Sequence, residues 1–194
     1  MPDTPAPTAA PAHAAQPAQT ALRTLITLQA ERLQQADVSY GHGTTNAFDE
    51  AAWLVLWQLG LPLDSDIDDP ALPAPTAAQQ QAVAALVEQR ISSRKPAAYL
   101  TGEAWLQGVP FYVDARAIIP RSLIAEVLAD GSIDAFLPAS TSRVLDLCTG
   151  NGSLAVLAAL AWPDVQVDAA DISDDALAVA RINIDKRGLQ QRIT

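Results

Sequence analysis

The segment from Arg143 to Arg187 constrains the fold most, because short apolar runs alternate there with runs of helical periodicity. The alternation predicts strands and helices in the order β-α-β-α, over residues 143–148, 153–161, 165–171 and 174–187. Helix-end signals frame the last helix, with Ser173 before it and Gly188 after it. Such an order builds a parallel sheet with right-handed crossovers, whose ligands bind at the carboxyl ends of the strands. We therefore expect an α/β domain with a ligand site in this half of the chain.

Two glycines occupy the predicted turn between the first of these strands and the helix after it. Gly150 and Gly152 allow the backbone to turn tightly and to approach a ligand without an intervening Cβ, while the following helix offers unpaired amide groups. Asp171 ends the next strand 21 residues after Gly150, where a carboxylate can accept both hydroxyls of a ribose. Taken singly, the glycines also fit a plain tight turn, and Asp171 fits a helix-flanking acid. Their order and spacing favour a nucleoside site.

The identity of the nucleoside depends on Asp146. The spacing Gly150-x-Gly152-x-x-Ala155 also satisfies the dinucleotide fingerprint, which keeps NAD as an alternative. A carboxylate at the end of the strand that leads into the glycines disfavours a pyrophosphate, but it favours a ligand with an ammonium or sulfonium group. S-adenosyl-L-methionine carries both of these positive groups and an adenosine. We therefore expect S-adenosyl-L-methionine as the cofactor.

The part of the chain before Pro96 is predicted to be helical, because its apolar residues recur at helical spacing. Three amphipathic helices are expected: one from Leu22, one after a cap at Thr44 or Thr45 that runs to Gly60, and one from Thr76. The face of the second helix that should pack in a bundle core holds Phe48, Ala52, Trp53, Leu56 and Trp57. Residues 97–120 are rich in aromatic, β-branched and turn residues, which indicates a β-hairpin between two domains. A helix is expected over 122–129.

Two further segments are expected to lack regular structure. Residues 1–20 read as a disordered leader, because twelve of them are Ala or Pro and few are large and apolar. Residues 61–76 read as a connection rich in proline and aspartate. The aspartates at 64, 66 and 68 resemble a calcium loop, but Asp69 stands where such a loop needs glycine and Pro75 where it needs a bidentate glutamate. A solvated loop is therefore the better interpretation.

Composition excludes several classes of protein. Twenty-two acidic against twelve basic residues give a net charge of −10, which disfavours direct DNA binding and favours a basic protein partner. No run of apolar residues approaches the roughly 20 that a membrane-spanning helix needs. The single cysteine, Cys148, cannot form an internal disulfide, so we expect a reducing, cytoplasmic location and no metal site built on cysteines.

The motifs together resemble a known family. Asp146-Leu-Cys-Thr-Gly-Asn-Gly152, followed by Asp171, is similar to the first two motifs of class I S-adenosylmethionine-dependent methyltransferases. Further matches narrow the resemblance to the protein-glutamine methyltransferases: Arg94-x-Pro96-x-x-Tyr99-Leu-Thr-Gly102, Phe111-Tyr-Val-Asp114 and Ile119-Pro-Arg121. One branch of that family acts on peptide chain release factors and another on a large-subunit ribosomal protein. Three segments resemble the ribosomal-protein branch: Gly41-His-Gly-Thr-Thr-Asn46, Asp49-Glu50 to Leu61-Pro-Leu-Asp64, and Pro120-Arg-Ser122.

The resemblance implies an organisation in two domains. The expected parts are a leader over 1–20, an all-α helical bundle for substrate recognition over 21–96, a β-hairpin linker over 97–120, and the first part of a Rossmann-like cofactor-binding domain over 121–194. The implied activity is methylation of a glutamine side-chain amide in a basic ribosomal protein. Release-factor methylation, and a substrate-binding module without chemistry, are the alternatives.

The resemblance also assigns residues around the glycine turn. The cofactor-binding set it implies is Asp146, Cys148, Thr149, Gly150, Asn151, Gly152 and Asp171, with Asp146 supporting the loop and Asp171 holding the ribose. Arg121 is expected either to approach the cofactor or substrate, or to pair with Glu126 or a neighbouring acid. We expect Cys148 to be a buried packing residue and not a nucleophile. Neither His13 nor His42 is an evident base, although the resemblance leaves a docking role open for His42.

The family's catalytic motif, Asn-Pro-Pro-Tyr, does not occur in these 194 residues. Its asparagine side chain and a proline carbonyl hold the substrate amide, and positioning of that kind supplies most of the help in an in-line methyl transfer. We therefore expect a C-terminally truncated chain with the cofactor half-site and no catalytic residue, in which a third strand would be starting at Thr194. Transfer of labelled methyl groups by the chain alone would refute this expectation.

Overall fold

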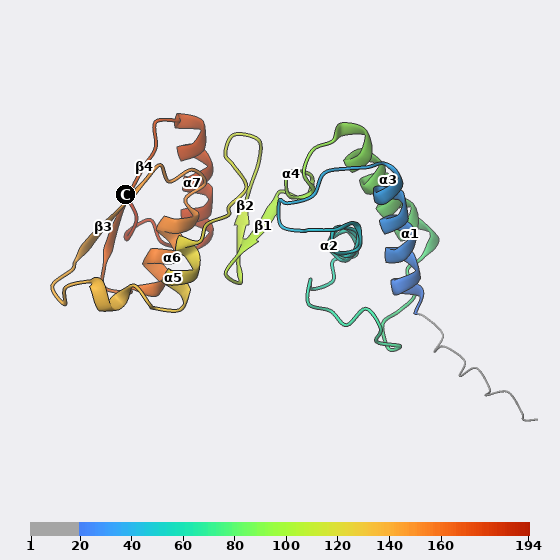
Figure 1. Cartoon of the computed structure of the whole chain (residues 1–194), viewed down its shortest axis with the longest axis horizontal. Helices are drawn as coiled ribbons and strands as arrows, with labels where there is room; N and C mark the ends of the chain where they lie inside the picture. The colour runs from blue at the N-terminus through green and yellow to red at the C-terminus, as the bar shows by residue number, and fades with distance from the viewer. Residues whose placement is uncertain (1–19) are drawn as a thin grey trace, which may run out of the picture.

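The computed structural model describes residues 20–194, so residues 1–19 of the expected leader lie outside the described part (Figure 1). Thr20, the last residue of that leader, instead belongs to the first helix. Helix α1 (Ala21–Gln35) begins with Thr20 as its N-cap, whose side chain accepts a hydrogen bond from the Arg23 amide at 3.1 Å. The hydroxyl of Thr20 also donates to the carbonyl of Ile67 at 2.6 Å, which ties this helix start to the 61–76 connection.

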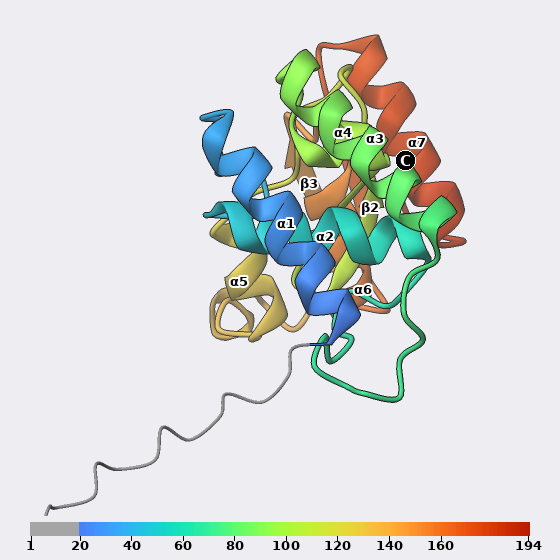
Figure 2. The same cartoon turned by 90° about the vertical axis from the view of Figure 1, so that its right-hand side faces the viewer.

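Three helices of the N-terminal part lie together in Figure 2, and their residues share one hydrophobic core. Helix α1 packs against α2 (Ala47–Leu59), and α2 packs against α3 (Ala77–Ser93). Thr76 caps α3 through a reciprocal capping box with Gln79, which confirms the predicted start of this helix. The side chains that fill the core are mainly aliphatic: Leu22, Leu25, Ile26, Leu33, Leu54, Val55, Leu56, Val83, Leu86 and Val87.

Helix α2 differs from its prediction in its cap and in its buried face. Asn46 is the N-cap, because its Oδ1 accepts the Asp49 amide at 2.9 Å. The prediction of Thr44 or Thr45 was wrong. The fully buried residues of the helix are Glu50, Ala51, Leu54, Val55 and Leu56, whereas the predicted core residues Phe48, Ala52, Trp53 and Trp57 are half-buried. The tryptophans therefore lie at the margin of the core and not at its centre.

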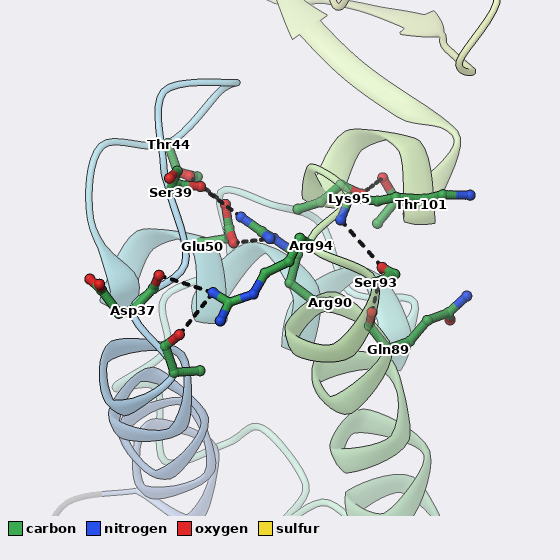
Figure 3. A network of polar contacts seen from close by, with 12 residues as sticks. Asp37, Ser39, Thr44, Glu50, Gln89, Arg90, Ser93, Arg94, Lys95 and Thr101 are labelled. Atoms are coloured by element: carbon green, nitrogen blue, oxygen red, sulfur yellow. Dashed lines mark hydrogen bonds and ion pairs between the residues drawn. The ribbon is translucent and has the colours of Figure 1, made fainter.

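A buried ion pair explains the orientation of α2 (Figure 3). Glu50 Oε1 accepts from Arg90 Nε of α3 at 2.8 Å, and the Arg90 side chain is only 2% exposed. Glu50 Oε2 accepts from the buried Thr44 hydroxyl at 3.0 Å, and Arg90 Nη2 donates to the Ser39 carbonyl at 2.8 Å. Two charges that leave water need such a full set of partners. The network therefore sets which face of α2 is buried, and it holds the segment before α2 on the helices.

A short helix and a hairpin follow. Helix α4 (Ala97–Thr101) occupies the start of the 97–120 segment, where only a hairpin was predicted. The hairpin itself is present, with β1 (Glu103–Leu106) antiparallel to β2 (Val109–Tyr112). Gln107 and Gly108 form its two-residue turn with φ angles of 49° and 73°, the left-handed pair that matches the twist of two paired strands. In Figure 1 the hairpin lies between the helical part and the remaining elements.

The second half of the chain has the predicted β-α-β-α order. Its elements are α5 (Ile124–Ala129), the short 3₁₀ helix η1 (Asp134–Phe136), β3 (Arg143–Leu147), α6 (Ser153–Ala161), β4 (Gln166–Ala170) and α7 (Asp174–Lys186). Strands β3 and β4 pair in parallel, from Arg143 opposite Gln166 to Leu147 opposite Ala170. Residues 192–194 pair in parallel with β4 as well, through the bridge between Val167 and Ile193. The chain therefore lies beside β4 at residues 192–194, close to Thr194, where the sequence predicts the start of a third strand.

The two faces of the β3–β4 sheet differ in burial. One face packs on helices α5 and α6 with Val144, Val167 and Ala169 in the core there. The opposite face exposes Leu145 and Leu147, which are 63% and 70% accessible. The Arg143 guanidinium pairs with Asp168 at 2.6 Å on that exposed face. The described part of the molecule thus covers one side of this sheet.

Residues 20–194 contain neither a helix that could span a membrane nor a group of side chains that could hold a metal ion. None of the helices described there combines the length and the apolar character required to cross a bilayer. Within the same range, the acidic, histidine and cysteine side chains do not gather into a group that would hold a metal ion.

Candidate functional site

The glycine turn lies at the carboxyl end of β3 and leads into α6. Three of its residues have left-handed backbones, since φ is 63° at Cys148, 56° at Gly150 and 80° at Gly152. The amide of Thr149 donates to the carbonyl of Ala170 at 2.9 Å, which extends the pairing of β3 with β4 into the turn. The turn is therefore anchored on both strands at the edge where parallel sheets bind ligands.

The two glycines have different surroundings. A Cβ on Gly152 would lie 3.0 Å from Cβ and 3.1 Å from Cα of Ala180 in α7, so only glycine allows this approach of turn and helix. A Cβ on Gly150 would meet nothing within 4 Å. Gly152 thus serves the packing of the domain, while Gly150 faces open space, as a ligand-binding glycine does.

Asp146 holds the turn from below. Its Oδ2 accepts from the Thr149 hydroxyl at 2.6 Å and from the Ala155 amide in the first turn of α6 at 3.0 Å. A carboxylate at a helix N-terminus also complements the helix dipole. These contacts fit the supporting role that the resemblance implied for Asp146, and they hold its carboxylate against the turn.

Asp171 connects the turn to the end of β4. Its Oδ2 accepts from the Gly150 amide at 2.8 Å, and its Oδ1 accepts from the Ser173 amide at 2.9 Å. These backbone hydrogen bonds, that of Ser173 first, lower the pKa of the Asp171 carboxyl below its ordinary value of 3.8. The carboxylate is ionised at neutral pH and only half-buried, so each oxygen keeps acceptor capacity for a ligand.

Asn183 is a part of the site that the sequence reasoning missed. This α7 side chain is 2% exposed, and its Nδ2 donates to the carbonyls of Asn151 and Tyr112 at 2.9 and 3.0 Å. Its Oδ1 accepts from the Tyr112 amide at 2.7 Å. The glycine turn, the hairpin and α7 therefore meet at one buried amide. An asparagine on the apolar side of a helix, where its propensity is poor, was the available signal.

The remaining turn residues separate into exposed and buried positions. Cys148 is exposed, so the prediction of a buried packing residue was wrong. Its left-handed backbone conformation follows the end of the strand and directs the residue to the surface. Thr149 and Asn151 are buried, and Asn151 Oδ1 accepts from the Ser153 amide at 3.2 Å. The side chains of these two residues stabilise the turn from within, whereas Cys148 and Gly150 present its outer surface.

Arg121 lies near the N-terminal part of the molecule. Its Nη1 donates to the carbonyl of Gly41 at 3.4 Å. Within residues 20–194, Arg121 forms no ion pair with Glu126 or another acid, so that alternative was wrong. His42 is exposed in the same 41–44 segment, and His13 lies outside the described residues.

Comparison with known proteins shows which proteins these features resemble. Residues 131–194 match the model of the methyltransferase small domain. The chain is 51% identical over 175 residues to the "Ribosomal protein uL3 glutamine methyltransferase" of Burkholderia pseudomallei, and 50% identical over 177 residues to the protein of that name from Bordetella pertussis. A third relative of the same name, from Neisseria meningitidis serogroup B, is 45% identical over 180 residues. This chain is therefore similar in sequence to glutamine methyltransferases.

The matches cover most of this chain but only part of each relative. They span 89%, 89% and 90% of the chain, and 56%, 58% and 57% of the relatives' own lengths. The matched region of a glutamine methyltransferase thus includes both the helical part and the glycine turn. The family resemblance seen in the sequence motifs is confirmed.

Proposed function

We propose that residues 121–194 form the first part of a Rossmann-like domain that binds S-adenosyl-L-methionine at the glycine turn. The observation that carries the proposal is the juxtaposition of Asp171 with Gly150, whose amide lies 2.8 Å from Oδ2. One contact joins the two features that a nucleoside site needs, an open glycine backbone and an acid at the end of the next strand. The cofactor-binding residues of the proposal remain Asp146, Cys148, Thr149, Gly150, Asn151, Gly152 and Asp171.

The described residues fit this cofactor. The open space beside Gly150 admits a ligand against the backbone, and Cys148 is exposed in the same turn. Asp171 would accept hydrogen bonds from the ribose hydroxyls, and the charge of Asp146 would favour the positively charged methionine part. When bound, S-adenosylmethionine supplies an electrophilic methyl group. The buried Asn183, which is not among these cofactor-binding residues, keeps the turn in shape and does not need to contact the ligand.

We further propose that the protein methylates a glutamine side-chain amide in a large-subunit ribosomal protein. The support is the identity of about half of the matched residues to enzymes named for that substrate. Residues 21–96 would recognise this basic substrate, and residues 97–120 would link recognition to the cofactor domain. A net charge of −10 attracts a basic protein and repels the nucleic acid to which that protein binds. The reaction would take place in the cytoplasm.

Calorimetric titration of the 194-residue chain tests the cofactor site. S-adenosylmethionine and its demethylated product should both bind. Replacement Asp171→Asn should weaken binding about tenfold or more, because it removes a charged acceptor for the ribose. The matched control is Asp175→Asn in the first turn of α7, which changes the same charge away from the turn and should alter affinity less than about twofold. Tight NAD binding without a response to S-adenosylmethionine would contradict the proposal.

A further inference from the structure

A large cavity lies away from the glycine turn, between α2 and the hairpin. Its volume is about 750 Å³. Its walls come from four parts of the chain: residues 43–44 with α2, residues 62–64, strand β1, and residues 119–120. The cavity therefore joins the helical part to the segment that leads into Arg121 and α5. Its lining includes residues of the segments that resemble the ribosomal-protein branch, whereas the cofactor site does not account for it.

The charged residues that line the cavity are all acidic. Asp49 and Asp64 line it, and among the described lining residues none is basic. Both side chains are exposed, and the Asp49 carboxylate accepts from Asn46 Nδ2 at 2.6 Å. Arg121 directly follows the lining residue Pro120, but its guanidinium is directed to the Gly41 carbonyl. A cation entering the cavity would thus meet two carboxylates that have no cationic partner in this part of the chain.

Two tryptophans line the same cavity. Trp105 of β1 is 46% exposed, and its Nε1 donates to Glu103 Oε1 at 2.8 Å, which holds the indole in place. Trp53 of α2 has a buried Nε1 without a hydrogen-bond partner in the described structure. The ring face of a large aromatic side chain attracts cations, above all the side chains of arginine and lysine. The combination of aromatic walls and acidic groups is selective for a cationic side chain with an apolar stem.

The wall of the cavity is held in place before any partner arrives. Thr44, which lines it, is buried and donates to Glu50, and Glu50 is fixed by Arg90 (Figure 3). Arg94 Nη1 adds hydrogen bonds to the carbonyls of Ala36 and Asp37 at 2.8 and 2.9 Å. The segment that leads to the cavity is therefore attached to Arg94, at the end of α3, and to Glu50 of α2. A rigid wall lowers the entropic cost of binding.

We propose that this cavity binds a lysine or arginine side chain of the protein substrate and so anchors the substrate on the helical part. The proposal rests on the proposed function only in taking a basic ribosomal protein as the source of that side chain. The carboxylates of Asp49 and Asp64 neutralise the cationic end, while Trp53 and Trp105 pack on its stem. The anchor lies apart from the glycine turn, so it acts on substrate affinity and leaves cofactor affinity unchanged.

Binding of purified ribosomal protein uL3 to the 194-residue chain tests the anchor. The double variant Asp49→Asn/Asp64→Asn should raise the dissociation constant about tenfold or more, and Trp105→Leu should raise it to a similar extent. Trp105→Phe keeps an aromatic face and should retain most of the affinity. The matched control is Glu31→Gln/Glu126→Gln, which removes two exposed charges outside the cavity and should change affinity less than about threefold.

Each other outcome would overturn the anchor. Equal weakening by the cavity variant and the control variant would show only general charge attraction, and absence of uL3 binding by the unaltered chain would exclude docking. Dimerisation that the cavity variants abolish would assign the cavity to a second copy of the chain. Thermal unfolding of each variant verifies its fold. Titration of the same variants with S-adenosylmethionine separates this proposal from the cofactor site, because their cofactor affinity should be unchanged.

Discussion

The helical part and the β-α-β-α part of this chain reach order by different means. The helical part closes its core on all sides with aliphatic residues, and it buries a complete ion pair, Glu50 with Arg90. The β-α-β-α part covers one face of its sheet and leaves Leu145 and Leu147 on the other. In this part, hydrogen bonds to the backbone fix the shape of the glycine turn. One region thus derives its shape from side-chain burial, and the other derives the shape of its glycine turn from hydrogen bonds to the backbone.

Removal of a charge from the helical core should have the largest effect. Arg90→Ala leaves the Glu50 carboxylate buried without its partner, which should reduce the free energy of unfolding by about 3–5 kcal/mol. Chemical denaturation with hydrogen exchange should show the loss in α2 and α3. The double variant Arg90→Met/Glu50→Leu removes both charges and should recover much of the stability. Equal loss in α6 and α7 would show that the two regions unfold as one unit and would abolish the distinction.

Glycine replacements should destabilise the β-α-β-α part, with a smaller loss in the free energy of unfolding. Gly152→Ala places a Cβ 3.0 Å from that of Ala180 at a φ of 80°, so it should cost about 3 kcal/mol. Gly150→Ala has open space at a φ of 56° and should cost only about 1 kcal/mol. Calorimetric titration should then show the reverse order for the ligand, since Gly150→Ala blocks the open face. Equal destabilisation by the two variants would contradict the division of roles between the glycines.

The smallest expected effect concerns the pH dependence of the stability of the β-α-β-α part. The pKa of Asp171 is lower in the folded protein than its ordinary value of 3.8, so its hydrogen bonds stabilise the fold fully above that value. This contribution should disappear as the pH falls below about 4 and through the folded pKa. Asp171→Asn should therefore show a smaller loss of stability than the unaltered chain between pH 5 and pH 2, in urea unfolding followed at α7. An identical pH profile in the two proteins would show that Asp171 contributes nothing.

Much of the secondary structure could be predicted because its signals are local. Thr76 and Ser173 cap helices by bonding amides within three residues, so their positions show in the sequence alone. The order β-α-β-α follows from apolar periodicity and required no knowledge of contacts. The short helix α4 escaped prediction because five residues are too few to show a helical period.

Two of the differences from prediction concern contacts between distant residues. Glu50 is buried because Arg90, 40 residues later, comes within 2.8 Å of it. This pair rotates α2 away from the face that its tryptophans suggested. Asn183 bonds Tyr112 across 71 residues, and no local pattern announces such a contact. Cys148 follows an apolar strand and was expected to be buried, yet the left-handed turn directs it outward.

The sequence by itself indicated the resemblance to glutamine methyltransferases, the alternation of strands and helices, and the glycine turn with its two aspartates. These depend on residue types at fixed spacing along the chain, which the backbone converts directly into turns, caps and strand ends. Only the tertiary structure decided which glycine of the turn has open space beside it, which carboxylate is buried, and that Asp49, Asp64, Trp53 and Trp105 line one cavity. Those properties arise from the packing of segments far apart in the chain, and packing depends on every neighbour at once.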